Sequence, residues 1–144
     1  MKILVGYDGS NAAKAALELA REHAMVEEAK IEVVNCMAQN RKLRYEDIRK
    51  VEENLEGEVH HILNSEKIPY QTHVVISDLE SGKELIQFAE QNKADEIIIG
   101  VRRRSKVGKL MFGSTAQYII LNSPCPVVSI NLTSASVCKV KKIT

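Results

Sequence analysis

The segment from residue 100 to residue 115, GVRRRSKVGKLMFGST, combines cations with glycines and contains no acidic residue. Its cations are Arg102, Arg103, Arg104, Lys106 and Lys109. The whole chain of 144 residues has a formal charge of only +1, so positive charge is concentrated in this segment. Glycine lets backbone N–H groups approach a phosphate oxygen closely, and arginine and lysine neutralise phosphate charge. These residue types therefore predict a site for a phosphate-bearing ligand.

A second segment with suitable chemistry is Asp8-Gly9-Ser10, which directly follows the apolar run at residues 2–7. Both segments stand between a predicted strand and a predicted helix, where the helix N-terminus favours an anion. Neither is a Walker A loop, in which Ser or Thr directly follows Gly-Lys, because Leu110 follows Gly108-Lys109. The glycine spacing also excludes the dinucleotide fingerprint GxGxxG.

Apolar runs that alternate with helical patterns must position these segments. Strands are predicted at residues 2–7, 30–37, 69–76, 96–100 and 126–132. The apolar residues at 13–24, 48–62 and 85–89 recur with helical spacing, and a further helix is expected from Ser114. Ser10 is the expected N-cap of the first helix, and Ser81–Glu84 and Ser114–Gln117 predict capping boxes. The alternation predicts one α/β domain at residues 1–132 with a doubly wound parallel sheet, followed by a flexible tail at 133–144.

Composition restricts the class of protein. With 44% hydrophobic and 27% charged residues, the chain is typical of a soluble globular protein, and no apolar run reaches the roughly 20 residues that span a bilayer. The odd set of Cys36, Cys125 and Cys138 contains no CxxC pair and argues against a disulfide framework, so a cytoplasmic location is expected. Near-neutral charge and 4% aromatic residues do not favour nucleic-acid binding.

Four pieces of sequence carry a resemblance to the universal stress protein family, from Lys2 to about Leu132. They are ILVGYDGS (3–10), ADEIIIG (94–100), VGKLMFGSTAQ (107–117) and SPCPVV (123–128). The resemblance implies a Rossmann-like fold of the adenine nucleotide alpha hydrolase type, with five strands in the order 3-2-1-4-5 and helices on both faces.

Nucleotide-binding members of that family carry a loop pattern of Gly, two residues, Gly, nine residues, Gly and then Ser or Thr. Gly100 and Gly113-Ser114 match the pattern here, whereas Arg103 replaces the second glycine. Its guanidinium would either meet the phosphate or close the pocket, and we favour binding. The resemblance implies a nucleotide site formed by Tyr7, Asp8, Gly9, Cys36, Met37, Gly100, Arg102, Arg103, Gly113, Ser114 and Thr115.

The expected ligand is ATP or another adenine nucleotide, alone or with Mg²⁺ or Mn²⁺, and no protein-held metal is expected. The resemblance also implies a homodimer through the last strand, Pro126 to Leu132. A regulatory or stress-response role with at most slow ATP hydrolysis is expected, because Asp8 is the only acid that we place at the site. The alternative is a dimeric interaction module of the same fold that binds no nucleotide and whose basic loop contacts an acidic partner.

Each site residue also has a purely structural interpretation. Local hydrogen bonds in a turn explain Asp8 as well as a ligand does, and helix capping explains Ser114. Gly9, Gly100 and Gly113 are equally consistent with tight turns. The sequence leaves these alternatives open.

Overall fold

The structure is a computed structural model that describes residues 1–40, 42–63, 67–102 and 113–132. Strands and helices alternate along these residues. The elements are β1 (Lys2–Gly6), α1 (Asn11–Glu27), β2 (Lys30–Ala38), α2 (Tyr45–Leu63), β3 (Tyr70–Ser77), α3 (Ser81–Gln91), β4 (Glu96–Arg102), α4 (Ser114–Asn122) and β5 (Val127–Leu132). Every strand pair is parallel, and the sheet order is β3-β2-β1-β4-β5. The predicted α/β fold class and strand order are therefore confirmed.

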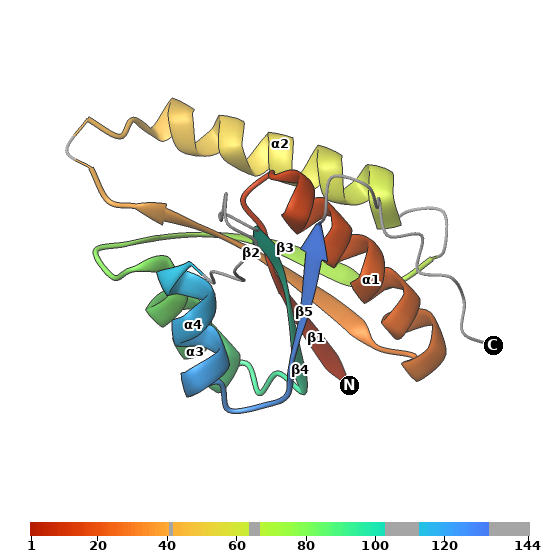
Figure 1. Cartoon of the computed structure of the whole chain (residues 1–144). Coiled ribbons are helices and arrows are strands. Elements are labelled where there is room, and N and C mark those ends of the chain that lie inside the picture. Colours follow the sequence, from red (N-terminus) through yellow and green to blue (C-terminus); the bar gives the residue numbers. More distant parts are fainter. Residues whose placement is uncertain (41, 64–66, 103–112, 133–144) are drawn as a thin grey trace.

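Helices cover both faces of the sheet, with α1 and α2 on one face and α3 and α4 on the other (Figure 1). Successive strand residues point to opposite faces, so Ile3 and Val5 are buried in the α1–α2 layer while Leu4 between them is buried in the α3–α4 layer. Burial on both sides explains why the central strands are continuous apolar runs instead of alternating ones.

The first turn of α1 packs directly against β4. Ser10 is its N-cap, as predicted, because the hydroxyl accepts a hydrogen bond from the Ala13 N–H at 3.1 Å. Small residues such as Ala12 and Ala16 form the buried side of this helix. A Cβ on Gly100 of β4 would lie 2.2 Å from the carbonyl oxygen of Ala12. The absence of a side chain at Gly100 therefore allows the helix to sit on the strand.

Both predicted capping boxes are wrong. The N-cap of α3 is Glu80 and that of α4 is Gly113, each with extended backbone and without a side-chain cap hydrogen bond. Ser81 and Ser114 are each the first helical residue, one position too late for an N-cap hydroxyl. Both serines therefore place a hydroxyl in the first turn of a helix.

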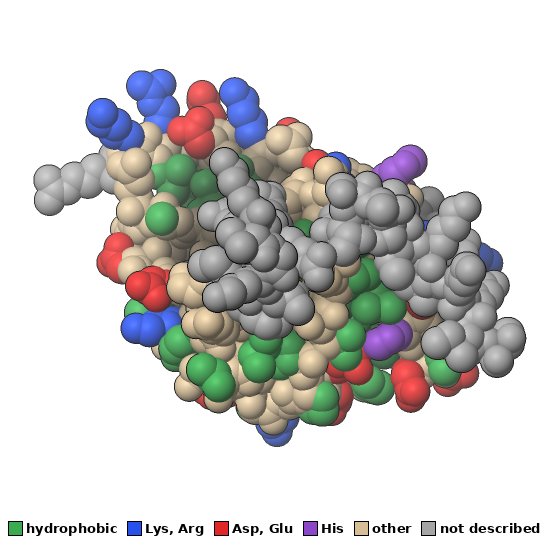
Figure 2. Space-filling model, in the orientation of Figure 1, with side chains coloured by type: hydrophobic (Ala, Val, Ile, Leu, Met, Phe, Trp, Pro, Cys, Tyr) green, Lys and Arg blue, Asp and Glu red, His purple; other side chains and the backbone are tan. Residues whose placement is uncertain are grey.

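The last strand, β5, forms one edge of the sheet. Pairing of β4 with β5 continues to Arg102 and Leu132, so β4 extends beyond its predicted end at Gly100. Hydrophobic side chains are exposed over α3 and α4 (Figure 2), and Leu121 of α4 is 80% exposed. None of the helices within the described ranges is long and apolar enough to cross a membrane.

Candidate functional site

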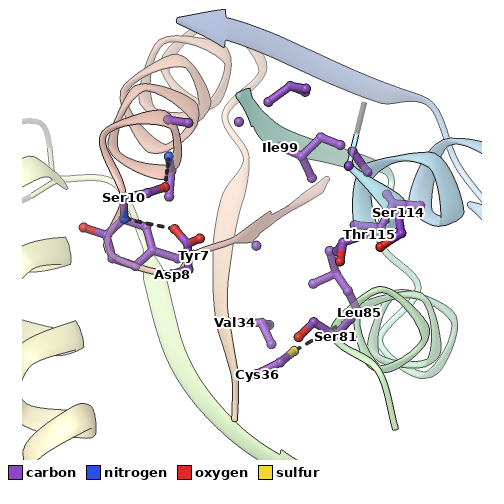
Figure 3. Close-up of a pocket in the computed structure, with 18 residues that line it drawn as sticks. Tyr7, Asp8, Ser10, Val34, Cys36, Ser81, Leu85, Ile99, Ser114 and Thr115 are labelled. Carbon is purple, nitrogen blue, oxygen red and sulfur yellow. Dashed lines mark hydrogen bonds between the residues drawn. The ribbon is translucent and has the colours of Figure 1, made fainter. Parts of the chain in front are cut away.

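A cavity of about 460 Å³ opens at the carboxyl ends of β1, β2 and β4. Strand order reverses at β1, because the chain passes from β1 to β2 on one side and later to β4 on the other. Open α/β sheets bind ligands at this switch point. Figure 3 shows two walls, one formed by Tyr7, Asp8 and Ser10 and the other by Ser81, Leu85, Ser114 and Thr115.

The structure brings most of the predicted site residues together. Those that line the cavity are Tyr7, Asp8, Cys36, Gly100, Gly113, Ser114 and Thr115. Gly9 and Met37 are described but do not line it, and the side chain of Arg102 lies outside the described part of the structure. Arg103 lies outside the described residues. Ser10, which belongs to the second candidate segment, also lines the cavity. Sequence analysis missed other lining residues, which include Gly6, Ala12, Val34, Ser81, Leu85 and Ile99.

The β1–α1 turn forms the acidic wall of the cavity. Asp8 Oδ1 accepts a hydrogen bond from the Ser10 N–H at 2.9 Å. Gly9 has a φ of 79°, a conformation that L side chains rarely adopt, so the turn itself requires this glycine. Asp8 thus makes a local hydrogen bond in the turn and also lines the cavity. Its carboxylate is therefore a structural group of the turn that also faces the site.

Tyr7 contributes to the site mainly by holding the end of β1. Its N–H donates to the carbonyl oxygen of Val34 at 2.9 Å, and its hydroxyl donates to Glu58 Oε2 at 2.5 Å. Burial, followed by the hydrogen bond and the negative charge of Glu58, raises the pKa of Tyr7 well above its ordinary value. The phenol therefore stays protonated, and both N–H and O–H donors of Tyr7 are used inside the protein.

The opposite wall carries hydroxyl groups from the first turns of α3 and α4. Ser81, Ser114 and Thr115 all line the cavity and are all exposed. The two helices approach closely, because a Cβ on Gly82 would lie only 3.3 Å from the Thr115 carbonyl oxygen. Ser81 was missed because the capping-box pattern assigned its hydroxyl to the helix. Its position at the start of the helix that follows β3, at the carboxyl edge of the sheet, was the available signal.

Cys36 lies at one end of the cavity, beside Val34 and Leu85 (Figure 3). Its thiol donates to the Ser81 carbonyl oxygen at 3.9 Å. Burial, and secondarily the charge of Glu84, raises the pKa of the Cys36 thiol to about 11. The thiolate is the reactive form, so at neutral pH Cys36 is a weak hydrogen-bond donor and not a nucleophile.

Glycine occupies the two matching positions of the loop pattern, Gly100 and Gly113, for different physical reasons. At Gly100 a side chain is excluded by the Ala12 carbonyl of α1, as described above. Gly113 has a φ of −63°, which any residue adopts. No heavy atom of the described chain lies within 4 Å of the position that its Cβ would take. Packing therefore explains Gly100, whereas no packing contact with the described part of the chain explains Gly113.

The described lining residues carry few ionisable side chains. Asp8 is the only Asp or Glu among them, and they include no Lys, Arg or His. Within the described ranges, no group of three or more His, Cys, Asp and Glu side chains could hold a metal ion. Efficient hydrolysis needs a positioned base together with stabilisation of the developing charge. The described residues instead offer helix N-termini, hydroxyl groups and one carboxylate around an apolar floor.

The fold and the cavity together define a Rossmann-like α/β protein with a cavity at the switch point of its sheet. The chain matches the profile of the Universal stress protein family over residues 1–131, and it belongs to that family. It is 30% identical over 131 residues to a universal stress protein of Mycolicibacterium smegmatis, covering 89% of this chain and 95% of that protein.

Solved structures are similar over the same range. A universal stress protein from Archaeoglobus fulgidus has 32% identity and a TM-score of 0.78, covering 90% of this chain and 98% of that one. The structure of the universal stress protein from Archaeoglobus fulgidus in complex with dAMP has 27% identity and a TM-score of 0.73. That similarity covers 90% of this chain and 97% of the other.

Proposed function

We propose that the protein binds an adenine nucleotide in this cavity and acts as a regulatory protein with little or no turnover. The observation that carries the proposal is the meeting of three helix N-termini around one space. The cavity is lined by Ala12 of α1, Ser81 of α3 and Ser114 of α4, each in the first turn of its helix. A helix N-terminus carries about half a positive charge and exposes N–H donors, so the three together favour an anion.

The relative that binds dAMP supports an adenine nucleotide as the anion. It shares 27% identity with this chain, and the likeness covers nearly all of both chains. The cavity volume of about 460 Å³ lies within the roughly 300–1,000 Å³ of small-molecule sites. Little or no turnover is part of the proposal because Asp8 is the only carboxylate among the described lining residues, whereas efficient hydrolysis needs several positioned groups. A protein that binds a nucleotide without consuming it suits a regulatory role.

The charges indicate how such a ligand would lie. The phosphate belongs at the start of α4, because Gly113, Ser114 and Thr115 line the cavity there and directly follow the basic segment in sequence. The Asp8 carboxylate repels phosphate and suits the hydroxyls of a ribose. We propose that Arg103, which lies outside the described residues, neutralises further phosphates of ATP, and that Mg²⁺ or Mn²⁺ would be held with the phosphates instead of by a protein cluster.

Nucleotide binding is tested on the purified full-length chain. We expect denaturation to release adenine nucleotide, and added ATP with Mg²⁺ to raise the melting temperature. A ligand at about a hundredfold its dissociation constant contributes roughly 2.7 kcal/mol to the free energy of unfolding. If no nucleotide is released and ATP, AMP and dAMP leave the melting temperature unchanged, the interaction-module alternative replaces this proposal.

We also propose that the protein forms a homodimer through β5. Val128 and Ile130 pack against the α1–α2 layer, so replacing them would damage the core as well as any interface. Ser129 between them is exposed. The Pro126 carbonyl accepts a hydrogen bond from the Ile97 N–H, and because strand residues alternate, the Ser129 N–H points away from β4.

Ser129→Pro is therefore expected to convert the dimer to a monomer while the sheet keeps its internal hydrogen bonds. Analytical ultracentrifugation should report a mass near the 16.1 kDa of one chain for this variant and about twice that for wild type. Ser129→Ala, which keeps the N–H, is the matched control and should remain dimeric. A dimer that survives Ser129→Pro would exclude strand pairing through β5.

A further inference from the structure

Ser81 presents a hydroxyl to the cavity that the helix does not use. It is the first residue of α3, exposed and part of the cavity lining, while Glu80 occupies the N-cap position. Within the described ranges, no hydrogen bond engages the Ser81 hydroxyl, whereas its backbone carbonyl accepts one from the Cys36 thiol at 3.9 Å. The backbone of Ser81 is thus held in place and its side chain is available to a ligand.

Gly82 positions Ser81 in the wall of the cavity. A Cβ at Gly82 would lie 3.3 Å from the Thr115 carbonyl oxygen and 3.3 Å from Tyr118 Cδ1, tighter than ordinary van der Waals contact. Glycine in the first turn costs helix stability, roughly 0.5–1 kcal/mol relative to alanine. The cost is offset by the close packing of α3 on α4, which brings Ser81 and Thr115 into one continuous wall (Figure 3).

Ser81 lies at the β2 end of the cavity. Figure 3 shows it beside Cys36 and Leu85, with Val34 nearby, whereas Ser114 lies farther along the wall toward Ile99. The side chains of Val34 and Leu85 suit the face of a heterocyclic base, and although α3 also begins at this end, only α4 directly follows the basic segment in sequence. If the phosphate lies at Ser114, the base therefore lies at Ser81.

We propose that the Ser81 hydroxyl hydrogen-bonds the base of the bound nucleotide and contributes to base selection. The inference rests on the proposed nucleotide function and adds a recognition residue from α3. A hydroxyl both donates and accepts, and it rotates to match the edge that the base presents. Loss of one such hydrogen bond corresponds to about a fivefold change in affinity.

The test compares Ser81→Ala with Ser114→Ala, using calorimetric affinities for AMP, adenosine and ribose 5-phosphate. Ser81→Ala should weaken AMP and adenosine by the same factor, about fivefold, and leave ribose 5-phosphate unchanged, because that ligand has no base. Ser114→Ala should weaken AMP and ribose 5-phosphate more than adenosine. Ser81→Thr keeps the hydroxyl and should retain the wild-type affinity for AMP.

Two results would overturn the inference while leaving nucleotide binding intact. One is an unchanged affinity of Ser81→Ala for AMP when wild type binds it, and the other is a larger loss for AMP than for adenosine. Failure of wild type to bind any of the three ligands would instead remove the proposed function itself, and with it this role of Ser81. Because Ser81 is exposed, unliganded Ser81→Ala should melt at the wild-type temperature.

Discussion

Gly113→Val is expected to abolish the stabilisation of the protein by nucleotide. Gly113 is the N-cap of α4 and lines the cavity, so a valine side chain would occupy the space that a phosphate needs to reach the N–H groups of the first turn. The roughly 2.7 kcal/mol that a ligand contributes at about a hundredfold its dissociation constant should fall to nearly zero. Thermal melting with and without ATP and Mg²⁺ measures this loss.

The same variant should fold normally, which makes the result interpretable. The φ of −63° at Gly113 is open to every residue, and no heavy atom of the described chain lies within 4 Å of a Cβ there. Gly57→Val is the matched control, since Gly57 is exposed in α2, equally free of described neighbours and absent from the cavity lining. An undiminished ATP shift in Gly113→Val would show that the ligand does not approach α4.

Gly100→Ala is expected to destabilise the fold strongly even without ligand. The added Cβ would lie 2.2 Å from the carbonyl oxygen of Ala12 and 2.3 Å from its carbonyl carbon, distances that real Cβ atoms do not show. These are backbone atoms of the first turn of α1, so relief requires movement of the helix away from β4. Overpacking of a core costs about 1–3 kcal/mol, occasionally more, and we expect a loss near the upper end or above it.

Urea unfolding of the unliganded protein measures this loss as a lower midpoint with an unchanged slope. Gly113→Ala, at the other glycine of the loop pattern, is the comparison and should leave the midpoint nearly unchanged. Equal midpoints for Gly100→Ala and wild type would contradict the close contact between α1 and β4. The pair of variants thus separates a packing glycine from a ligand-facing one.

Much of the fold could be predicted because its signals are local. The apolar run at residues 2–7 and the buried strand from Glu96 were recognisable without any tertiary information. The cap at Ser10 was also predicted correctly, because its hydroxyl bonds to the N–H of Ala13, only three residues farther along the chain. The sheet order came from the family resemblance, whose four pieces span nearly the whole domain.

Helix starts were less certain because the same local pattern allows two solutions. Ser81 and Ser114 each precede an acidic or amide residue by three positions, as a capping box requires. In the structure each helix begins one residue earlier, with Glu80 and Gly113 as N-caps. The packing of α3 on α4 at Gly82 accompanies this shift, and no local pattern encodes a contact between the two helices.

The amino-acid sequence alone specified the alternation of strands and helices and the two candidate segments that begin at Asp8 and Gly100. The roles of individual residues at the cavity became visible only in the folded protein. Gly100 accommodates α1, Tyr7 directs its hydroxyl to Glu58, and Ser81 faces the cavity. The reason is that periodicity and turns depend on neighbours along the chain, whereas each of these roles depends on contacts with residues far away in sequence.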